Sequence, residues 1–474
     1  MDLERNRLFV VSNRLPIAVD EDDKGNPTIQ PAAGGLVTAL QPILERHGGA
    51  WLGWPGSNAP EVPGLLDEFN NDSPFNLHAV EMSEEEVDLY YRGFSNQTVW
   101  PLFHDFLGAA EFHRHTWRAY QDVNRKFAEA IADKLEPDHL VWIHDYQLML
   151  VGTYLREMGV TRPIAYFLHI PFPSGDIFRR LPWRREIARA LLEYDMLGFQ
   201  TERDRRNFGD MIRWMCSESK VRHHKRMTLI ECDERTVHAG NFPISIDFRE
   251  FDNHARSKSV SKESGMVKVF YRGNQLILGL DRLDYTKGIP ERFRAYERLL
   301  EKYPQWIGKV TLIQVVVPSR TKVEQYQRLK ERLDQMTGKI LGRFSQPGWV
   351  PIHYFFKRLD REELLAHYRA ADVAFVTPLR DGMNLVAKEY CASHPKLDGT
   401  LLLSEFAGSA EELKDGAVMV NPYDLEKTAD ALHQALSMSE EERRSRMKRL
   451  RRKISTNNVH RWVRFFMDAV ERDL

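Results

Sequence analysis

The chain has 474 residues, of which 42% are apolar and 28% charged, a composition typical of a globular protein with two or three domains. Its 67 basic and 68 acidic side chains nearly cancel, so no overall positive field indicates a nucleic-acid-binding protein. The three cysteines lack CxxC spacing and no apolar run is long enough for a signal segment or membrane span, so we expect a cytoplasmic protein without cysteine zinc sites, disulfides or membrane contact.

Short apolar runs, many of them β-branched, alternate with charged, helix-like stretches along the whole chain. They form two series, at residues 7–13, 140–146, 164–170 and 196–201, and then at 276–282, 310–318, 372–378, 401–406 and 417–422. This alternation predicts an α/β protein with doubly wound parallel sheets, covered on both faces.

A polar, Ser/Lys-rich stretch at 249–268 separates the two series. We therefore predict two Rossmann-like domains that face each other across a deep cleft, an N-terminal one at 1–248 and a C-terminal one at 249–455. Apolar residues at helical spacing predict a terminal helix at 456–474 that packs back on the N-terminal domain.

Polar side chains follow several strands of the first domain, where open α/β sheets bind their ligands. Arg14 ends the first strand in SNRLP, and a Gly34-Gly35 pair follows in AAGGL, directly before a helix-like segment. Paired glycines let backbone amides approach a phosphate, although such a pair is more often an ordinary turn.

Other candidates in this domain are aromatic side chains and histidines. Tyr91 and Trp100 could form a wall and supply a hydroxyl for a sugar, but each alone fits a core position equally well. His144 and His169 lie at strand ends without the partners of a metal site, and a buried histidine is most often structural. Asp145 is the stronger hydrogen-bond acceptor.

The second domain carries two cationic strand ends. In LDRLDYTKG, Arg282 and Lys287 can both reach a diphosphate and neutralise its charge as it leaves. Arg320 ends VVPSR, and together with Arg14 it could clamp a second, separate phosphate if the cleft closes.

The segment DVAFVTPLRDGMNLVAKEY at 372–390 predicts a buried strand, a glycine loop and a helix N-terminus. Asp381 can accept hydrogen bonds from sugar hydroxyls, and Glu389, about two turns further on, from a second diol. An ordinary strand-to-helix loop is the competing interpretation. SEFAGSAEEL at 404–413 predicts another substrate-side loop.

Two other enzyme classes fail on specific residues. No GxGxxG follows the first strand, which argues against a dinucleotide-dependent dehydrogenase. KLDGT has Lys396 where a phosphatase would need its aspartyl nucleophile.

Taken in order, the motifs resemble the trehalose-6-phosphate synthase family over nearly the whole chain. They are SNRLP, AAGGL, YYRGFSN with its later WP, WIHDYQLM, FLHIPFP, LGFQTERDRRNF, LDRLDYTKGIPERF, PSR, TPLRDGMNLVAKEY, SEFAGSAEEL and VNPYD. The resemblance implies a GT-B enzyme that transfers glucose from UDP-glucose to glucose 6-phosphate with retention, with no cofactor or metal and no nucleophile. It also implies a homo-oligomer, a dimer or tetramer.

The resemblance also assigns roles by position. The catalytic residues are Arg282, Lys287, His169 and Asp381, and the last two bond the donor glucose. The acceptor is held by Arg14, Tyr91, Trp100, Asp145 and Arg320. The donor is held by Gly34, Gly35, Arg282, Lys287, Gly382, Met383, Asn384, Leu385, Val386, Ala387, Lys388 and Glu389, and Glu389 takes the ribose.

One position departs from the family pattern. The chain reads HDYQ where members usually read HDYH, so Gln147 replaces a histidine beside the acceptor site. Glutamine keeps a donor and an acceptor but carries no charge. Two alternatives therefore stay open: a synthase of glucosylglycerol phosphate that uses glycerol 3-phosphate, and a catalytically silent regulatory member. Arg282, Lys287 and Glu389 are all present, which argues against the silent member.

Overall fold

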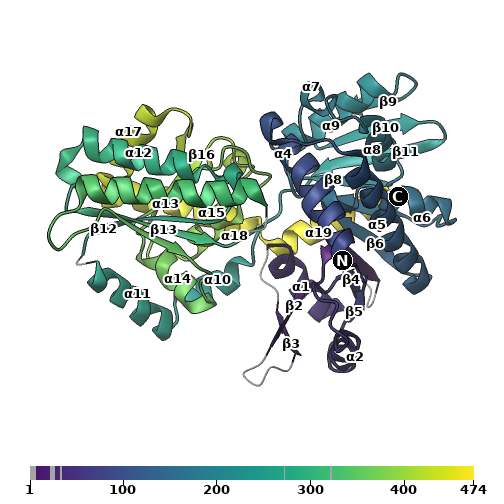
Figure 1. The fold of residues 1–474 in the computed structure, drawn as a ribbon, viewed down its shortest axis with the longest axis horizontal. Helices are drawn as coiled ribbons and strands as arrows, with labels where there is room; N and C mark the ends of the chain where they lie inside the picture. The colour runs from purple at the N-terminus through teal and green to yellow at the C-terminus, as the bar shows by residue number, and fades with distance from the viewer. Residues whose placement is uncertain (1–6, 22–26, 32–34, 272, 321–322, 474) are drawn as a thin grey trace. The chain divides into compact units, whose positions relative to one another are not determined.

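The computed structural model describes residues 7–21, 27–31, 35–271, 273–320 and 323–473, and these form two compact units (Figure 1). Unit 1 comprises Met1–Ile244 with His460–Leu474, and unit 2 comprises Ser245–Val459. The division thus follows residue 244 rather than 248. The polar stretch that we expected as a separator forms helices α10 (Phe248–Ala255) and α11 (Lys258–Phe270) of unit 2.

The main sheet of unit 1 has the order β5-β4-β1-β6-β7-β8-β11-β10-β9. Its strands are β1 (Leu8–Arg14), β4 (Ala50–Trp54), β5 (Asn76–Ala79), β6 (Leu140–His144), β7 (Ile164–Phe167), β8 (Met196–Phe199), β9 (Lys220–His223), β10 (Met227–Cys232) and β11 (Arg235–Asn241). All neighbours pair in parallel except β10, which is antiparallel to β9 and β11. A separate hairpin joins β2 (Ile17–Glu21) and β3 (Pro27–Pro31).

The sheet of unit 2 is parallel throughout, with the order β14-β13-β12-β15-β16-β17. Its strands are β12 (Gln275–Arg282), β13 (Val310–Val317), β14 (Ile352–Phe356), β15 (Val373–Val376), β16 (Thr400–Ser404) and β17 (Val418–Val420). Side chains alternate between two buried clusters: Ile277 and Leu312 pack on one face, and Leu278 and Ile313 on the other. Both faces are therefore covered, which explains the unbroken apolar character of these strands.

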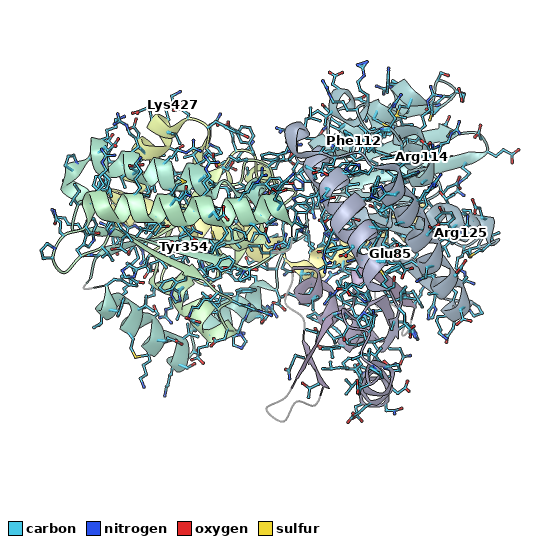
Figure 2. The ribbon with its side chains drawn as sticks, viewed as in Figure 1. Glu85, Phe112, Arg114, Arg125, Tyr354 and Lys427 are labelled. Atoms are coloured by element: carbon cyan, nitrogen blue, oxygen red, sulfur yellow. The ribbon has the colours of Figure 1, made fainter. Side chains whose placement is uncertain are left out.

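The helices complete the layers of each unit. In unit 1 they are α1 (Gly35–His47), α2 (Val62–Asp72), α3 (Glu84–Glu86), η1 (Val87–Val99), α4 (Trp100–Phe103), η2 (Leu107–Ala109), α5 (Arg114–Lys134), η3 (Tyr146–Leu148), α6 (Val151–Glu157), α7 (Gly175–Phe178), α8 (Arg184–Leu191), α9 (Glu202–Met215) and α19 (Val459–Asp473). In unit 2, after α10 and α11, they are η4 (Tyr285–Lys287), α12 (Ile289–Lys302), η5 (Pro304–Trp306), α13 (Glu324–Phe344), α14 (Arg361–Ala370), α15 (Leu385–Ala392), α16 (Ala410–Leu413), α17 (Leu425–Leu436) and α18 (Glu440–Thr456). Their outer faces are charged, as Arg125 of α5 and Lys427 of α17 illustrate (Figure 2).

The terminal helix α19 packs within unit 1. The Phe466 ring stacks on Trp142 of β6 with centroids 4.4 Å apart, and the Trp462 indole donates to the Phe242 carbonyl at 3.1 Å. The last fifteen helical residues thus help to close the core beneath the central strands of the first sheet.

Counted from its first strand, each unit has the strand order 3-2-1-4-5-6 that defines doubly wound sheets. This confirms the predicted α/β class with parallel sheets in two units. In such a sheet the strand order reverses between the first and fourth strands, which lie side by side and parallel, and ligands bind at that switch point. The switch point lies between β1 and β6 in unit 1 and between β12 and β15 in unit 2.

Candidate active site

In unit 1 the switch point carries Arg14 at the end of β1 and Asp145 just after β6. The Arg14 guanidinium lies over the Trp54 ring, 4.6 Å from its centroid. Gly56 permits this position, since a Cβ there would lie 2.0 Å from the nearer guanidinium nitrogen. Asp145 has φ 76°, a costly conformation for a non-glycine residue. Its carboxylate accepts the His169 N–H at 3.2 Å, which joins the ends of β6 and β7.

Tyr91 and Trp100 lie on consecutive helical segments, η1 and α4. The η1 segment is a π-helix, a rare element often found at functional sites, and apolar periodicity carries no signal for it. The Trp100 indole is 5% exposed and packs on Tyr146, whose ring centroid is 5.5 Å away. Tyr146 follows Asp145 directly in the chain. Trp100 is therefore a core residue that packs on the sequence neighbour of Asp145, the candidate acceptor-binding residue. Gln147, at the position that departs from the family pattern, is buried one residue further on.

In unit 2 the switch point brings Lys287 and Asp381 into contact. The Lys287 ammonium pairs with the Asp381 carboxylate at 2.6 Å, and the Asn384 amide donates to the same oxygen at 3.2 Å. Both members of the pair are only 12–13% exposed. Arg282, at the end of β12, is exposed instead. The two motifs that the sequence analysis treated separately therefore form one charged cluster.

Two glycines allow the loops around this cluster to touch. Gly288 has φ 63°, and a Cβ there would lie 2.2 Å from the Thr377 carbonyl oxygen, so only glycine fits between β12 and β15. Gly408, in SEFAGSAEEL, lies against the loop that contains Asp381. Its N–H donates to the Asp381 carbonyl at 3.0 Å, and the next N–H, of Ser409, donates to the Met383 carbonyl at 2.8 Å. The SEFAGSAEEL segment thus holds the DGMN loop in place through these two backbone hydrogen bonds.

Replacing Gly408 by alanine should destabilise unit 2 by about 1–3 kcal/mol, because the new Cβ would need backbone movement to fit. That Cβ would lie 1.7 Å from the Gly382 carbonyl oxygen. Chemical denaturation measures the change. Gly338→Ala in α13 is the matched control: a Cβ there meets nothing within 4 Å, so it should stabilise the protein by about 0.5–1 kcal/mol. Equal effects of the two substitutions would contradict the close approach.

Asp284, which was not among the predicted residues, is buried beside the cations of this candidate site. Its carboxylate is 2% exposed, accepts the Thr286 N–H at 3.0 Å and lies 3.5 Å from the Arg320 guanidinium. Burial alone would raise the pKa of Asp284, but the charges of Arg320, Lys287 and Arg282 outweigh it and hold the pKa below its usual value. The charges of three neighbouring cations thus act on one buried carboxylate. Its place within the LDRLDYTKG motif could have indicated this position.

Arg320 itself is tightly held. It has φ 49°, its side chain is 6% exposed, and its guanidinium donates to the Tyr326 hydroxyl at 2.5 Å. Tyr326 comes from the first turns of α13 and was not among the predicted residues. Such over-determined geometry in a strained backbone is typical of a binding residue.

The helix after the DGMN loop, α15, has the open N-terminus that the sequence predicted. Some residues further along the helix are buried. Asn384, with φ 74°, caps α15 by accepting the Ala387 N–H at 3.2 Å, which leaves the N–H groups of Leu385 and Val386 in the open first turn. Ala387 is fully buried, and its N–H serves this cap, so it is not available to a ligand.

Lys388, expected at the donor, is buried instead. Its side chain is 1% exposed and forms an ion pair with Glu412 of α16. The Asn457 amide donates to the other Glu412 oxygen at 2.9 Å. The Lys388 ammonium therefore links α15 to α16, and the donor contact expected of this residue stays a prediction.

The Glu389 side chain is partly buried, and its carboxyl has a polar partner. Burial raises the pKa of its carboxyl, whereas the hydrogen bond from the Tyr368 hydroxyl, which donates to Oε2 at 2.7 Å, acts to lower it.

Of the predicted glycine pair, Gly34 lies outside the described residues, and Gly35 begins α1.

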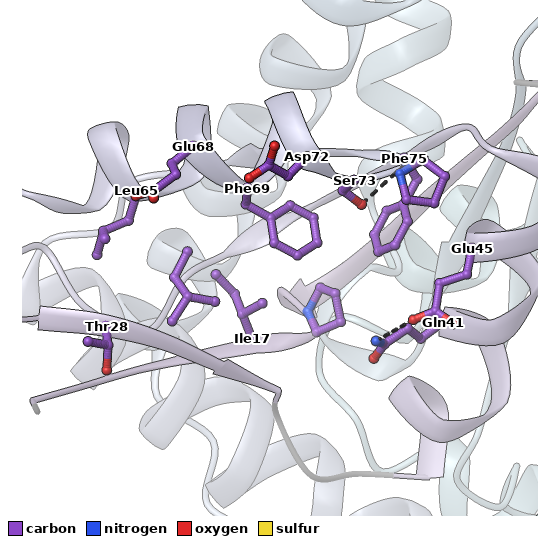
Figure 3. Close-up of a pocket in the computed structure, with 13 residues that line it drawn as sticks. Ile17, Thr28, Gln41, Glu45, Leu65, Glu68, Phe69, Asp72, Ser73 and Phe75 are labelled. Atoms are coloured by element: carbon purple, nitrogen blue, oxygen red, sulfur yellow. Dashed lines mark hydrogen bonds between the residues drawn. The ribbon is translucent and has the colours of Figure 1, made fainter.

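A separate cavity of about 610 Å³ lies in unit 1 between the β2–β3 hairpin and α2 (Figure 3). Its floor is apolar, with Ile17, Phe69 and Phe75, and Glu68 and Asp72 lie along its rim. It contains none of the predicted site residues. Within the described ranges, no three His, Cys, Asp or Glu side chains gather as metal ligands, and no helix is long and apolar enough to cross a membrane.

Comparisons with known proteins identify the family of the chain. The family model described as glycosyltransferase family 20 matches residues 6–472. A trehalose-6-phosphate synthase of Mycolicibacterium vanbaalenii is 42% identical over 468 residues, which cover 97% of this chain and 95% of the relative. One of Mycobacterium bovis is 41% identical over 471 residues, covering 97% and 94%.

Solved structures are also similar, over nearly the whole chain. An α,α-trehalose-phosphate synthase (UDP-forming) of Burkholderia xenovorans, in complex with glucose 6-phosphate, has TM-score 0.89 and 36% identity, covering 98% of this chain and 100% of that one. An Escherichia coli protein bound with UDP-2-fluoro glucose has TM-score 0.87 and 37% identity, covering 98% of each chain.

Proposed function

The chain belongs to glycosyltransferase family 20, as its motifs predicted, and we propose that it transfers glucose from UDP-glucose to glucose 6-phosphate with retention, releasing UDP and α,α-trehalose 6-phosphate. Its relatives carry the synthase name, and two similar structures hold glucose 6-phosphate or a UDP-glucose analogue. The scheme uses no metal and no organic cofactor.

The observation that carries this proposal is the charged cluster of unit 2. Arg282 ends β12, Lys287 ends η4 after it, and Lys287 contacts Asp381 after β15, at the switch point of the sheet. Cations at this point can neutralise the charge that grows on a leaving diphosphate. The carboxylate beside them can accept hydrogen bonds from glucose hydroxyls, and so hold the sugar next to its leaving group.

The chemistry exchanges two bonds at one carbon. The bond from glucose C1 to the β-phosphate oxygen breaks, and a bond forms from C1 to the anomeric oxygen of glucose 6-phosphate on the same face. The proton of that acceptor hydroxyl passes to the departing phosphate oxygen, so no protein nucleophile is needed. Arg282 and Lys287 stabilise the diphosphate throughout.

We assign the other residues by the partner each would hold. Asp381 and His169 would bind the donor glucose, and Glu389 would bind the ribose. The amides from Gly382 to Val386 and those of Gly34 and Gly35 would bind the donor phosphates or sugar. Arg14, Tyr91, Asp145 and Arg320 bind the acceptor, with Trp100 behind them.

Incubation with UDP-glucose and either glucose 6-phosphate or glycerol 3-phosphate tests the proposal. NMR of the products should identify α,α-trehalose 6-phosphate, whose two anomeric protons both carry the small α coupling. An absence of UDP release with glucose 6-phosphate would refute the proposal. Release with glycerol 3-phosphate alone would favour the glucosylglycerol phosphate reaction that Gln147 leaves open.

Arg320→Ala should raise the KM for glucose 6-phosphate by about 10- to 100-fold, the value of a lost charged hydrogen bond, and change the donor KM far less. Initial-rate kinetics with each substrate varied in turn measure both constants. Arg328→Ala is the matched control, since this exposed arginine of α13 pairs only on the surface, with Glu324. An equal rise in the two KM values would refute the acceptor role.

A further inference from the structure

The His169 ring is held at both of its nitrogens. Nε2 lies 3.1 Å from Nδ1 of His144, and Nδ1 lies 3.3 Å from the side-chain nitrogen of Gln200. His144 ends β6, His169 follows β7 and Gln200 follows β8, so three adjacent strands contribute one side chain each.

The backbone N–H of Ile244 determines which atoms donate in these hydrogen bonds. The side-chain carbonyl oxygen of Gln200 accepts this N–H at 2.9 Å, which fixes the side-chain amide with its NH₂ group toward His169. Since this group can only donate, His169 Nδ1 must accept, and its proton must lie on Nε2. Nε2 then donates to His144 Nδ1, and the His144 proton lies on its own Nε2.

We propose that Gln200 and His144 are positioning residues that hold His169 as the neutral Nε2–H tautomer in a single ring orientation. The inference about the ring stands on these contacts alone. Its consequence for the donor sugar rests on the proposed function, in which His169 faces the glucose of UDP-glucose.

The surroundings favour a neutral pair of rings. Burial lowers the pKa of His169 to about 3 and holds that of His144 well below its usual value. Within the described part of the chain, His144 Nε2 is buried without a hydrogen-bond partner. Such an orphan donor is costly, which suggests that the arrangement is retained for function rather than for stability.

Aromatic packing fixes the ring planes. The Phe167 ring lies 4.6 Å from His169 between centroids, and Trp142 lies 4.5 Å from His144. The two imidazoles are nearly parallel, 28° apart. Neither ring can therefore turn to exchange its nitrogens without disturbing the core beneath β6 and β7.

The fixed tautomer decides what a sugar hydroxyl meets. A hydroxyl that reaches Nδ1 finds an acceptor, because the proton lies on the opposite nitrogen. The 3.3 Å contact with Gln200 is longer than a usual N–H···N bond, so an incoming hydroxyl can displace it or share it. The same hydroxyl can then accept from the Gln200 amide.

Gln200→Glu is the sharpest test, because it keeps the shape but removes the donor. The carboxylate still accepts from Ile244 and now also accepts from His169, so the proton should move to Nδ1 or the ring should become charged. Two-bond ¹H–¹⁵N spectra of enzyme labelled at histidine distinguish the Nε2–H, Nδ1–H and imidazolium patterns. The signals of His169 are assigned by their loss in His169→Gln, and those of the other histidines are the internal control.

We expect the Nε2–H pattern in the unmodified enzyme without substrate, and its loss in Gln200→Glu. The KM for UDP-glucose should rise by about 10-fold or more, while that for glucose 6-phosphate stays within about twofold. Gln200→Met, which removes the donor to His169 and also the acceptor of the Ile244 N–H, serves if the charged variant fails to fold, and should raise the same KM. An Nδ1–H or imidazolium pattern in the unmodified enzyme, or a pattern and donor KM both unchanged in Gln200→Glu, would overturn the proposal. Because the spectra need no turnover, absence of synthase activity would leave the tautomer test intact.

Discussion

Replacing Lys287 by alanine should lower kcat by about 100- to 1,000-fold, the usual effect of removing one charge that stabilises a transition state. The reason is its place at the end of η4, the turn that follows β12 at the switch point, where a leaving diphosphate gains charge. The KM for glucose 6-phosphate should change little, because the acceptor is held by other residues. Steady-state kinetics with both substrates measure the three constants.

The ion pair with Asp381 makes this prediction sharper. In the free enzyme the two side chains lie 2.6 Å apart, so the lysine is held in place before any donor binds. Asp381→Asn should therefore also lower kcat, and the double variant should lose less than the product of the two single losses. Lys287→Arg keeps the charge and serves as the control. A rise in the donor KM with kcat unchanged would mean that Lys287 binds ground state and transition state equally, which contradicts the assigned role.

Both sheets could be predicted from sequence because their central strands are buried on both faces. All nine apolar runs that we interpreted as strands are strands, from β1 to β17. The strands that were missed lie at or near edges or carry mixed polarity, such as β9 (Lys220–His223) and β14 (Ile352–Phe356). An edge strand is half covered, so its apolar signal is short and interrupted.

The candidate site was predictable where the polar residue itself ends a strand. Arg14, Asp145, Arg282 and Asp381 lie at the two switch points because parallel strands bring their carboxyl ends to one edge. Their partners could not be predicted: Tyr326 comes from α13 and Tyr368 from α14, and nothing in their local sequence marks a site. Long-range packing decides such contacts.

Lys388 is the clearest example of a side chain whose surroundings the sequence did not predict. It lies between Ala387 and Glu389 in a motif that resembles the family's donor segment, so the resemblance assigned it a donor contact. Successive helix residues point about 100° apart, however, and this step turns Lys388 toward Glu412 and Glu389 toward Tyr368. Sequence alone did not settle which face of α15 was buried.

The buried ion pair of Lys388 and Glu412 leads to the second large prediction. Lys388→Met should destabilise the protein by about 3–5 kcal/mol, because it leaves the Glu412 carboxylate buried without its cation. That carboxylate is only 11% exposed, and within the described chain Asn457 would remain as its hydrogen-bond donor. Denaturant unfolding of the unmodified protein and the variant gives the difference.

The double variant Lys388→Met with Glu412→Gln separates a structural role from a binding role. If the ammonium only balances Glu412, removing both charges should restore most of the stability, since a buried pair replaced by matched neutral groups is often near neutral. Asn457 can still donate to the glutamine carbonyl, so the contact between α16 and the end of α18 remains. The donor KM of the double variant should then lie within about threefold of the unmodified value, because the first-turn amides of α15 and Glu389 keep their positions. A restored stability with a donor KM that stays raised would instead mean that Lys388 contacts the nucleotide sugar, and would return this residue to the donor site.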